Sequence, residues 1–336
     1  MPRADHLAGL DLLHFRPHAG AHRVALRAGI SVFVPLLTLA LIDRPEWSMY
    51  AAFGAFASLY GRNHVHLSRA AMQASAGAAL VAAVMAGVAV GMLDNAAWVA
   101  VPVAAVVAGL ASALSRAQDW QPPGSLFLVF AFGACASVPH DASDLAPALL
   151  VSGGSALFAV VVGAVGGFAR GDRSLPSRVR FRRSWLPLQD FAAAGVAGAL
   201  ATAAGIGHPY WAAVAAVAPL SARGLRSQLT RGIQRVLGTL LGLLTSAALL
   251  GLHLQGVVLL VVIAALQVAA ELLVGRNYAV AMLVITPLAL LMGQTAHEQP
   301  VGALLFDRGV ETVIGSTVGL LLILGLYWWR RRGRLA

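Results

Sequence analysis

The sequence predicts an all-α fold: a polytopic helical membrane protein of about twelve transmembrane segments, arranged as two six-segment parallel repeats. Three observations predict it: the composition, the spacing of charge-free stretches, and an alternation of arginine between loops. Of 336 residues, 59% are hydrophobic and 11% are charged, and the mean hydropathy is +0.77. A soluble fold of this length has too little interior to bury so much apolar side chain. The composition therefore excludes an ordinary soluble enzyme, a disordered tail and a fibrous repeat.

The chain is strongly basic, with a net charge of +10 and a pI of about 11.2. In a soluble protein such numbers would suggest a nucleic-acid partner, but almost no polar domain is present to carry that site, so none is expected. The lone Cys135 excludes a disulfide framework and a cysteine metal cluster. Residues 1–27 are polar and lack an early apolar stretch with a cleavage site, so we expect no signal peptide.

The segments follow from the stretches that lie between charged residues. A spanning helix needs about 20 apolar residues. Two stretches, 191–222 and 236–270, are long enough for two segments each and are interrupted at His208-Pro209 and at 252–256. The predicted segments are 22–43, 47–61, 69–93, 96–115, 124–139, 145–169, 188–206, 209–222, 232–253, 255–274, 278–294 and 306–329.

The loops between these segments test their number independently. If the N-terminus is cytoplasmic, the cytoplasmic loops hold all but two of the 24 arginines. The opposite loops keep only Arg44 and Arg308, beside eight acidic residues. Because cytoplasmic loops of membrane proteins are enriched in Arg and Lys, we expect a multi-pass protein of the cell membrane with both termini in the cytoplasm. Most of the positive charge then reflects topology.

The most basic loop divides the chain into similar halves. We expect an N-terminal membrane half at 1–169, a cytoplasmic linker at 170–187 and a C-terminal membrane half at 188–336. Arg62 follows Trp47 by fifteen residues in the first half, and the same spacing recurs between Trp211 and Arg226 in the second half. Six segments is an even number, so the halves enter the membrane in the same sense. This predicts a pseudo-two-fold axis along the membrane normal, with a path between the halves.

The first two segments of each half are the short ones. They cover 28–42, 47–61, 191–206 and 209–222. Fifteen helical residues rise about 22 Å, less than the hydrocarbon thickness. These segments are either thin peripheral helices or broken, re-entrant ones, and whether they span is open. Short segments at matching positions in two halves point to a transport site.

No motif of an enzyme is present: there is no P-loop, GxSxG elbow, HExxH or cysteine pair. We therefore expect no enzyme, no cofactor and no metal. Ionisable residues within the membrane are costly and usually functional. Glu271 lies inside an apolar segment and either exchanges a proton during transport or pairs with Arg276 or an arginine of 223–235. Glu311 is the second candidate for proton coupling.

Several arginines are candidates for binding an anion. Arg231 and Arg235 share one helix face, and Thr239 follows among small residues. A guanidinium fork binds carboxylates bidentately, but these arginines also suit positive-inside anchoring. Arg308 lies on the acidic side, where it binds substrate or pairs with Asp307 or Glu311.

The tryptophans complete the set of candidates. Trp47 and Trp211 fit an interfacial aromatic belt and equally suit stacking on an aromatic ligand at a helix break. The candidates for substrate binding or for the path are Trp47, Arg62, Trp211, Arg226, Arg231, Arg235, Thr239, Arg276, Asn277 and Arg308.

Longer motifs carry a family resemblance. They include Trp185-Leu-Pro-Leu-Gln-Asp-Phe191, Gln228-Leu-Thr-Arg-Gly-Ile-Gln-Arg-Val-Leu-Gly-Thr239, Glu271-Leu-Leu-Val-Gly-Arg-Asn-Tyr278, and in the first half Trp47-Ser-Met-Tyr-Ala-Ala-Phe-Gly-Ala-Phe56. The sequence resembles the FUSC family, the fusaric acid resistance protein-like integral membrane transporters, in an actinobacterial form. The resemblance covers nearly the whole chain and is tightest over 185–315.

The resemblance implies efflux of organic anions, aromatic carboxylic acids in particular, driven by the proton gradient. It also implies kinship with plant aluminium-activated malate channels, which conduct anions passively. Many family members carry a large cytosolic domain where this chain has only the linker at 170–187. We therefore expect an exporter of small organic anions in the lipid bilayer. The alternatives are a passive anion channel and a non-transporting membrane scaffold, and monomer or homo-oligomer is open.

Overall fold

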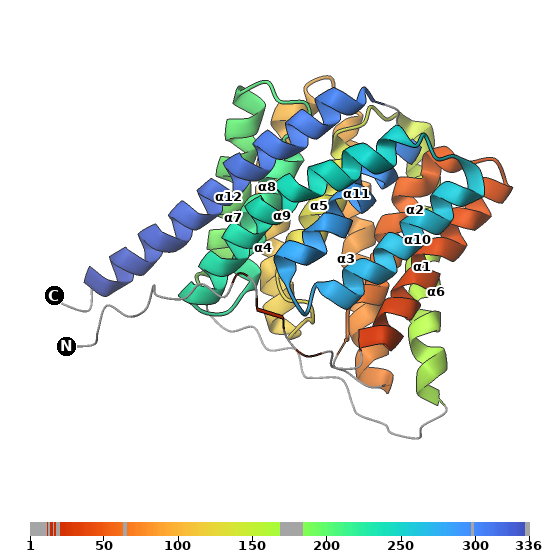
Figure 1. Ribbon diagram of the computed structural model, residues 1–336, viewed down its shortest axis with the longest axis horizontal. Helices are drawn as coiled ribbons and strands as arrows, with labels where there is room; N and C mark the ends of the chain where they lie inside the picture. Colours follow the sequence, from red (N-terminus) through yellow and green to blue (C-terminus); the bar gives the residue numbers. More distant parts are fainter. Residues whose placement is uncertain are drawn as a thin grey trace.

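The protein is almost entirely α-helical (Figure 1). A computed structural model describes residues 21–62, 66–168, 184–296 and 299–332, with Leu12, His14, Phe15 and Pro17. Within these residues there are twelve α-helices and no strand. The helices are α1 (Ala21–Leu41), α2 (Ser48–Ala55), α3 (His66–Gly91), α4 (Ala96–Ala117), α5 (Leu126–Ala136), α6 (Leu145–Phe168), α7 (Leu186–Ala203), α8 (Tyr210–Val217), α9 (Leu225–Gly251), α10 (Gly256–Leu273), α11 (Tyr278–Ala296) and α12 (Val301–Arg332). Of the predicted linker at 170–187, residues 170–183 lie outside the described residues.

Eight of these helices are long and apolar enough to cross a membrane: α1, α3, α4, α6, α9, α10, α11 and α12. The prediction of a polytopic helical membrane protein is therefore confirmed. The predicted segment 22–43 is confirmed by α1, whose 21 residues extend beyond the short charge-free stretch at 28–42. Its first turns include Arg23 and Arg27, whose long side chains let a helix continue past the charge-free stretch.

The short helices are buried in the interior. The helices α2 and α8 have eight residues each and are continued by 3-10 turns at Phe56–Leu59 and Pro219–Ser221. The helix α5 has only eleven residues, although a segment of ordinary length was expected there. Most side chains of all three are buried. Irregular backbone is tolerated at membrane depth where protein surrounds it, which is the position of these helices.

Glycine brings the long helices against the short ones. A Cβ atom at Gly319 of α12 would stand only 2.5 Å from the carbonyl oxygen of Ala216 in α8. Gly54 of α2 makes an equally close approach to the backbone of Ser152 in α6. Small residues at helix crossings allow this backbone contact. Each half therefore holds its second helix tightly against its sixth.

The same helix pairings occur in both halves. In the first half α3 packs against α5 and α6, and α2 packs against α6. In the second half α9 packs against α11 and α12, and α8 packs against α12. Across the halves, α4 packs against α7 and α10 packs against α1; the latter pair is visible at the right of Figure 1. Two six-helix halves related by a two-fold axis would pack in this way.

The two ends of the helix bundle differ in charge. At what we term the basic end, Arg62 pairs with Glu271 and Arg223 pairs with Asp119 at 3.6 Å. At the opposite, acidic end the ion pairs are Arg44–Glu46, His140–Asp144 and His208–Asp307, at 3.3, 3.2 and 3.4 Å. The basic end is thus formed by the loops that lie next to the arginines. The acidic end is formed by the loops that carry most of the carboxylates.

Candidate functional site

A cavity of about 290 Å³ lies between the two halves. Its wall includes four arginines, Arg62, Arg231, Arg235 and Arg308, and one carboxylate, that of Glu271. Aromatic rings form much of the remaining wall: Phe56, Phe127, Phe130, Trp211 and Tyr278. Ligand pockets are typically about 300–1,000 Å³ and mostly apolar with a few placed polar groups. The cavity therefore suits a small ligand with one or two rings and negative charge.

Two of the arginines meet at a tyrosine. The Nη1 atom of Arg235 donates a hydrogen bond to the hydroxyl of Tyr278 at 2.8 Å. The guanidinium of Arg231 lies over the same ring, 4.3 Å from its centroid. The helices that carry them are in close contact, since a Cβ at Gly238 of α9 would stand 2.5 Å from the carbonyl oxygen of Ala279 in α11. The i, i+4 spacing in α9 thus places both guanidinium groups on the cavity wall.

Arg308 enters the cavity from α12. Only 1% of its surface is exposed, and its guanidinium lies 3.7 Å from the centroid of the Trp211 ring. Its Nε and Nη1 atoms have no hydrogen-bond partner among the described residues. The two carboxylates expected to pair with it are engaged elsewhere. Asp307 pairs with His208, and Glu311 accepts the backbone N–H of His208 at 2.9 Å.

Glu271 pairs with Arg62. The partner expected from the sequence was Arg276 or an arginine of 223–235, and that expectation is wrong. Arg62 follows a turn at Gly61, whose φ of 75° is readily adopted only by glycine. This turn directs Arg62 of the first half toward α10 of the second. The ion pair therefore joins the two halves in the wall of the cavity.

The other six candidates stand outside the cavity wall; they are Trp47, Arg226, Thr239, Arg276, Asn277 and Glu311. Trp47 lies at the acidic end under the guanidinium of Arg44, 5.2 Å from its ring centroid. Asn277 caps α11 by accepting the backbone N–H of Val280 at 3.1 Å, and its amide donates to the backbone oxygen of Leu12 at 2.9 Å. These contacts assign Trp47 and Asn277 structural positions.

Sequence reasoning missed the phenylalanines of α5 and one buried acid. Phe127 and Phe130 are three residues apart in a short helix, so they share a face, and both line the cavity. Their signal was the aromatic run that follows Pro122-Pro123-Gly124. Asp190 of α7 is buried and accepts hydrogen bonds from Ser112 at 3.0 Å and Ser125 at 2.7 Å. It lies within a predicted segment, so its position could have been noticed.

Aromatic rings separate the cavity from the acidic end. Phe130 stands between Phe53 and Trp211, with centroid distances of 4.9 and 4.6 Å, and Tyr210 lies 4.8 Å from Trp211. We term these four residues the aromatic layer. Phe130 and Trp211 face the cavity and also a hollow of about 60 Å³. Tyr210 borders that hollow and a larger one of about 490 Å³ at the acidic end.

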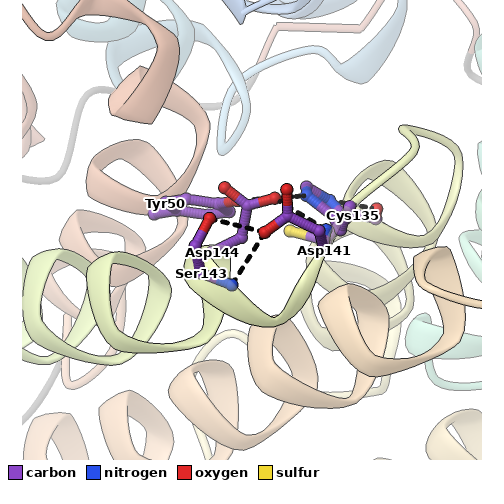
Figure 2. Close-up of polar contacts among 6 residues, drawn as sticks. Tyr50, Cys135, Asp141, Ser143 and Asp144 are labelled. Atoms are coloured by element: carbon purple, nitrogen blue, oxygen red, sulfur yellow. Dashed lines mark hydrogen bonds and ion pairs between the residues drawn. The ribbon is translucent and has the colours of Figure 1, made fainter.

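A second polar cluster lies at the acidic end (Figure 2). Its centre is His140, whose Nε2 donates to the carbonyl oxygen of Cys135 at 2.9 Å. The Nδ1 of the same ring lies 3.2 Å from Asp144 and 3.3 Å from the Tyr50 hydroxyl. Asp141 accepts the backbone N–H of Ser143 at 2.7 Å. The hydroxyl and backbone of Ser143 lower the pKa of Asp141 below its ordinary value of 3.8. We term these residues the His140 cluster.

Comparison with known proteins agrees with this architecture. Residues 196–322 match the model of a family described as fusaric acid resistance protein-like. The chain is also similar to the uncharacterized membrane protein YvaC of Bacillus subtilis (strain 168), with 35% identity over 132 residues, which are 39% of this chain and 21% of that protein. The chain thus spans about a fifth of the length of this relative. No solved structure matches. The similarity to the fusaric acid resistance protein-like family thus covers residues 196–322, which form most of the second half of the chain.

Proposed function

We propose that the protein is a carrier, and not an enzyme, that exports small organic anions, aromatic carboxylates in particular, with the proton gradient as its energy source. Its basic end and both termini face the cytoplasm of the cell in this proposal. The observation that carries it is the cavity between the halves, where four arginines stand among aromatic rings. The family that residues 196–322 resemble supports a transporter.

The charge of the cavity wall supports an anionic ligand. Buried cations within a membrane are costly unless an anion accompanies them. Glu271 supplies one negative charge and is already paired with Arg62. Arg235 and Arg308 add two buried positive charges to the wall. A bound carboxylate offsets part of this charge and accepts charge-assisted hydrogen bonds from the guanidinium groups.

The aromatic wall supports a ligand that contains a ring. Phe127, Phe130 and Trp211 offer ring faces and edges to the same cavity that holds the arginines. Offset or edge-to-face ring pairs contribute about 0.5–1.5 kcal/mol beyond the burial of area. A carboxylate on an aromatic ring therefore satisfies both parts of the wall, with the acid group at Arg231 and Arg235.

The separation of the cavity from the acidic end supports a carrier over an open channel. The aromatic layer stands between the cavity and the hollows beyond it. In an alternating-access cycle the anion binds from the basic end, the two halves move relative to each other, and the layer opens toward the acidic end. Glu271 and Glu311 are two buried carboxylates at which a transported proton can bind.

Transport by the purified full-length chain in liposomes tests this proposal. Labelled benzoate is loaded, a pH gradient is imposed, and efflux is compared with protein-free liposomes. We expect benzoate to move against its concentration gradient only when the pH gradient is present. The Glu271→Gln variant separates the alternatives: a proton-coupled carrier loses uphill transport, whereas a passive channel keeps its conductance. If no aromatic acid moves across the membrane at all, this result contradicts the proposal and favours the scaffold.

A further inference from the structure

The surroundings of Arg308 are those of a ligand-binding side chain. The side chain is 1% exposed, lines the cavity, and has two guanidinium nitrogens without a hydrogen-bond partner among the described residues. Buried polar groups are normally hydrogen-bonded, and an exception needs an explanation. The Cζ atom of its guanidinium lies over the Trp211 ring, 3.7 Å from the ring centroid. A stacked guanidinium keeps its N–H groups at the edges, where they can meet an acceptor.

We propose that Arg308 forms a second anion-binding position in the cavity, so that the carrier selects aromatic dianions, with two acid groups on one ring system, over monoanions. This inference rests on the proposed function and narrows its substrate class. The first position consists of Arg231, Arg235 and Tyr278, and is termed the Arg235 position. The second consists of Arg308 on Trp211, and is termed the Arg308 position.

The two positions lie at different depths in the bundle. The helices α9 and α12 pack antiparallel, since Gly309 meets Leu240 and Leu243, whereas Gly232 meets Leu320. These pairings place the backbone of Arg308 about two helical turns, or about 12 Å along the axes, from the level of Arg235. One carboxylate cannot satisfy both arginines at that spacing unless the side chains converge. A ring with acid groups on opposite sides can place one group at each position.

The charge of the wall favours two negative charges over one. The Arg62–Glu271 pair is neutral as a unit. Arg235 and Arg308 are both buried in this wall, and each has a guanidinium nitrogen without a hydrogen-bond partner among the described residues. One acid group can engage one of these two guanidinium groups, whereas two acid groups can engage both. Uncompensated buried charge is strongly unfavourable, so the second acid group strengthens binding.

The wall between the two positions is aromatic. Phe130 and Trp211 both line the cavity, and their centroids are 4.6 Å apart. The wall therefore offers aromatic surface to the ring that joins the two acid groups. An aliphatic dianion would also reach both positions, but it would not make these contacts with the aromatic rings.

Binding of two simple acids to the purified full-length protein tests the inference. Isothermal titration at pH 7.5 and constant ionic strength compares benzoate with benzene-1,4-dicarboxylate. We expect the dicarboxylate to bind at least about tenfold more tightly, the size of one charge-assisted hydrogen-bonding group. In Arg308→Gln the dicarboxylate should lose much more affinity than benzoate does, so that the two affinities converge to within about threefold.

Two further variants control the result. Arg44→Gln removes the other arginine of the acidic end, which is exposed and paired with Glu46 outside the cavity, and should keep the preference for the dicarboxylate. Arg308→Lys keeps the charge without the fork and should retain part of that preference. This variant also covers the case in which Arg308→Gln fails to fold, which melting temperature and elution profile report.

The outcomes separate this inference from the proposed function. If benzoate and the dicarboxylate bind equally to the unmodified protein, the Arg308 position is wrong and the export of monoanions stands. If Arg308→Gln weakens both acids by the same factor, Arg308 belongs to a single anion position and the dianion selection is wrong. If neither acid binds, the proposed function itself fails.

Discussion

The cavity and the His140 cluster both gather polar side chains, yet their hydrogen bonding differs. In the His140 cluster both ring nitrogens of His140 have acceptors or donors within 3.3 Å. In the cavity, Arg308 has two nitrogens without a partner and Arg235 has one, among the described residues. The first arrangement is complete without a ligand. The second leaves guanidinium nitrogens to which an entering molecule can bind.

This difference separates structural polar groups from binding ones. The contacts of His140 tie α2, the end of α5 and the start of α6 together at the acidic end. The arginines of the cavity contact rings, Tyr278 and Trp211, which position a guanidinium without neutralising it. Mutations in the first region should therefore reduce stability, and mutations in the second should reduce binding.

Loss of Arg235 should give the largest effect on binding. Arg235→Gln removes a buried guanidinium of the cavity wall, and we expect benzoate affinity to fall by about 10–100-fold, the equivalent of a lost charge-assisted hydrogen bond. Isothermal titration measures it. The control is Arg226→Gln, which removes an exposed arginine from the same helix and should leave affinity unchanged. Equal losses in both variants would show that only the general basic charge matters.

Loss of His140 should act on stability instead. His140→Ala removes three polar contacts at the acidic end, and we expect unfolding free energy to fall by about 1–3 kcal/mol, with a lower melting temperature and unchanged benzoate affinity. Thermal denaturation and titration on the same sample measure both. His253→Asn is the control, because this exposed histidine in the α9–α10 loop has a φ of 47°, which asparagine also tolerates. A change in affinity without a change in melting temperature would show that His140 contributes to binding and not to stability.

The aromatic wall should give a smaller, selective effect. In Phe130→Leu the apolar volume is largely kept but ring contacts are lost, so aromatic anions should bind about 2–10-fold more weakly. The affinity of an aliphatic anion such as hexanoate should hardly change. Phe306→Leu, at an exposed phenylalanine of α12, provides the control. An equal loss for both kinds of anion would mean that Phe130 contributes area and no ring selectivity.

Asp141 should give the smallest effect, and one that depends on pH. Its folded-state pKa is lowered by Ser143, so its contribution to stability is present above its ordinary pKa of 3.8 and is lost as the pH falls through the lowered folded value. The melting temperature of Asp141→Asn should therefore lie slightly below that of the unmodified protein at neutral pH. The two should converge in acid. A constant difference across this range would assign the effect to geometry and not to ionisation.

The sequence was a good guide to the fold and a partial guide to the site. Charge-free stretches located all twelve helices, because helix number follows from apolar length and loop charge. The predicted segment 22–43 matches α1, although its charge-free part alone is shorter because Arg23 and Arg27 lie inside the helix. The predicted segment 124–139 is longer than α5, which has eleven residues. The local sequence does not determine at what depth in the helix bundle a helix ends.

Within the site, spacing along one helix was predictable and pairing between distant segments was not. The i, i+4 relation correctly placed Arg231 and Arg235 on one face. The partner of Glu271 was not predictable, because Arg62 is more than two hundred residues away and reaches it only through the packing of the two halves. Whether Arg308 faced an acid or a ring likewise depended on α8, which carries Trp211.

The paired packing of the halves has a consequence for how many ligands one chain can hold. The helix contacts repeat across the halves, yet the charged groups do not: the second half supplies Arg231, Arg235, Arg308 and Glu271 to the cavity, and the first half supplies Arg62. Among the described residues, the repeated helix contacts therefore come without a second copy of these charged groups. In the proposed transport cycle, one such cavity in each chain moves one anion per turnover, so transport by a single chain should show no cooperativity.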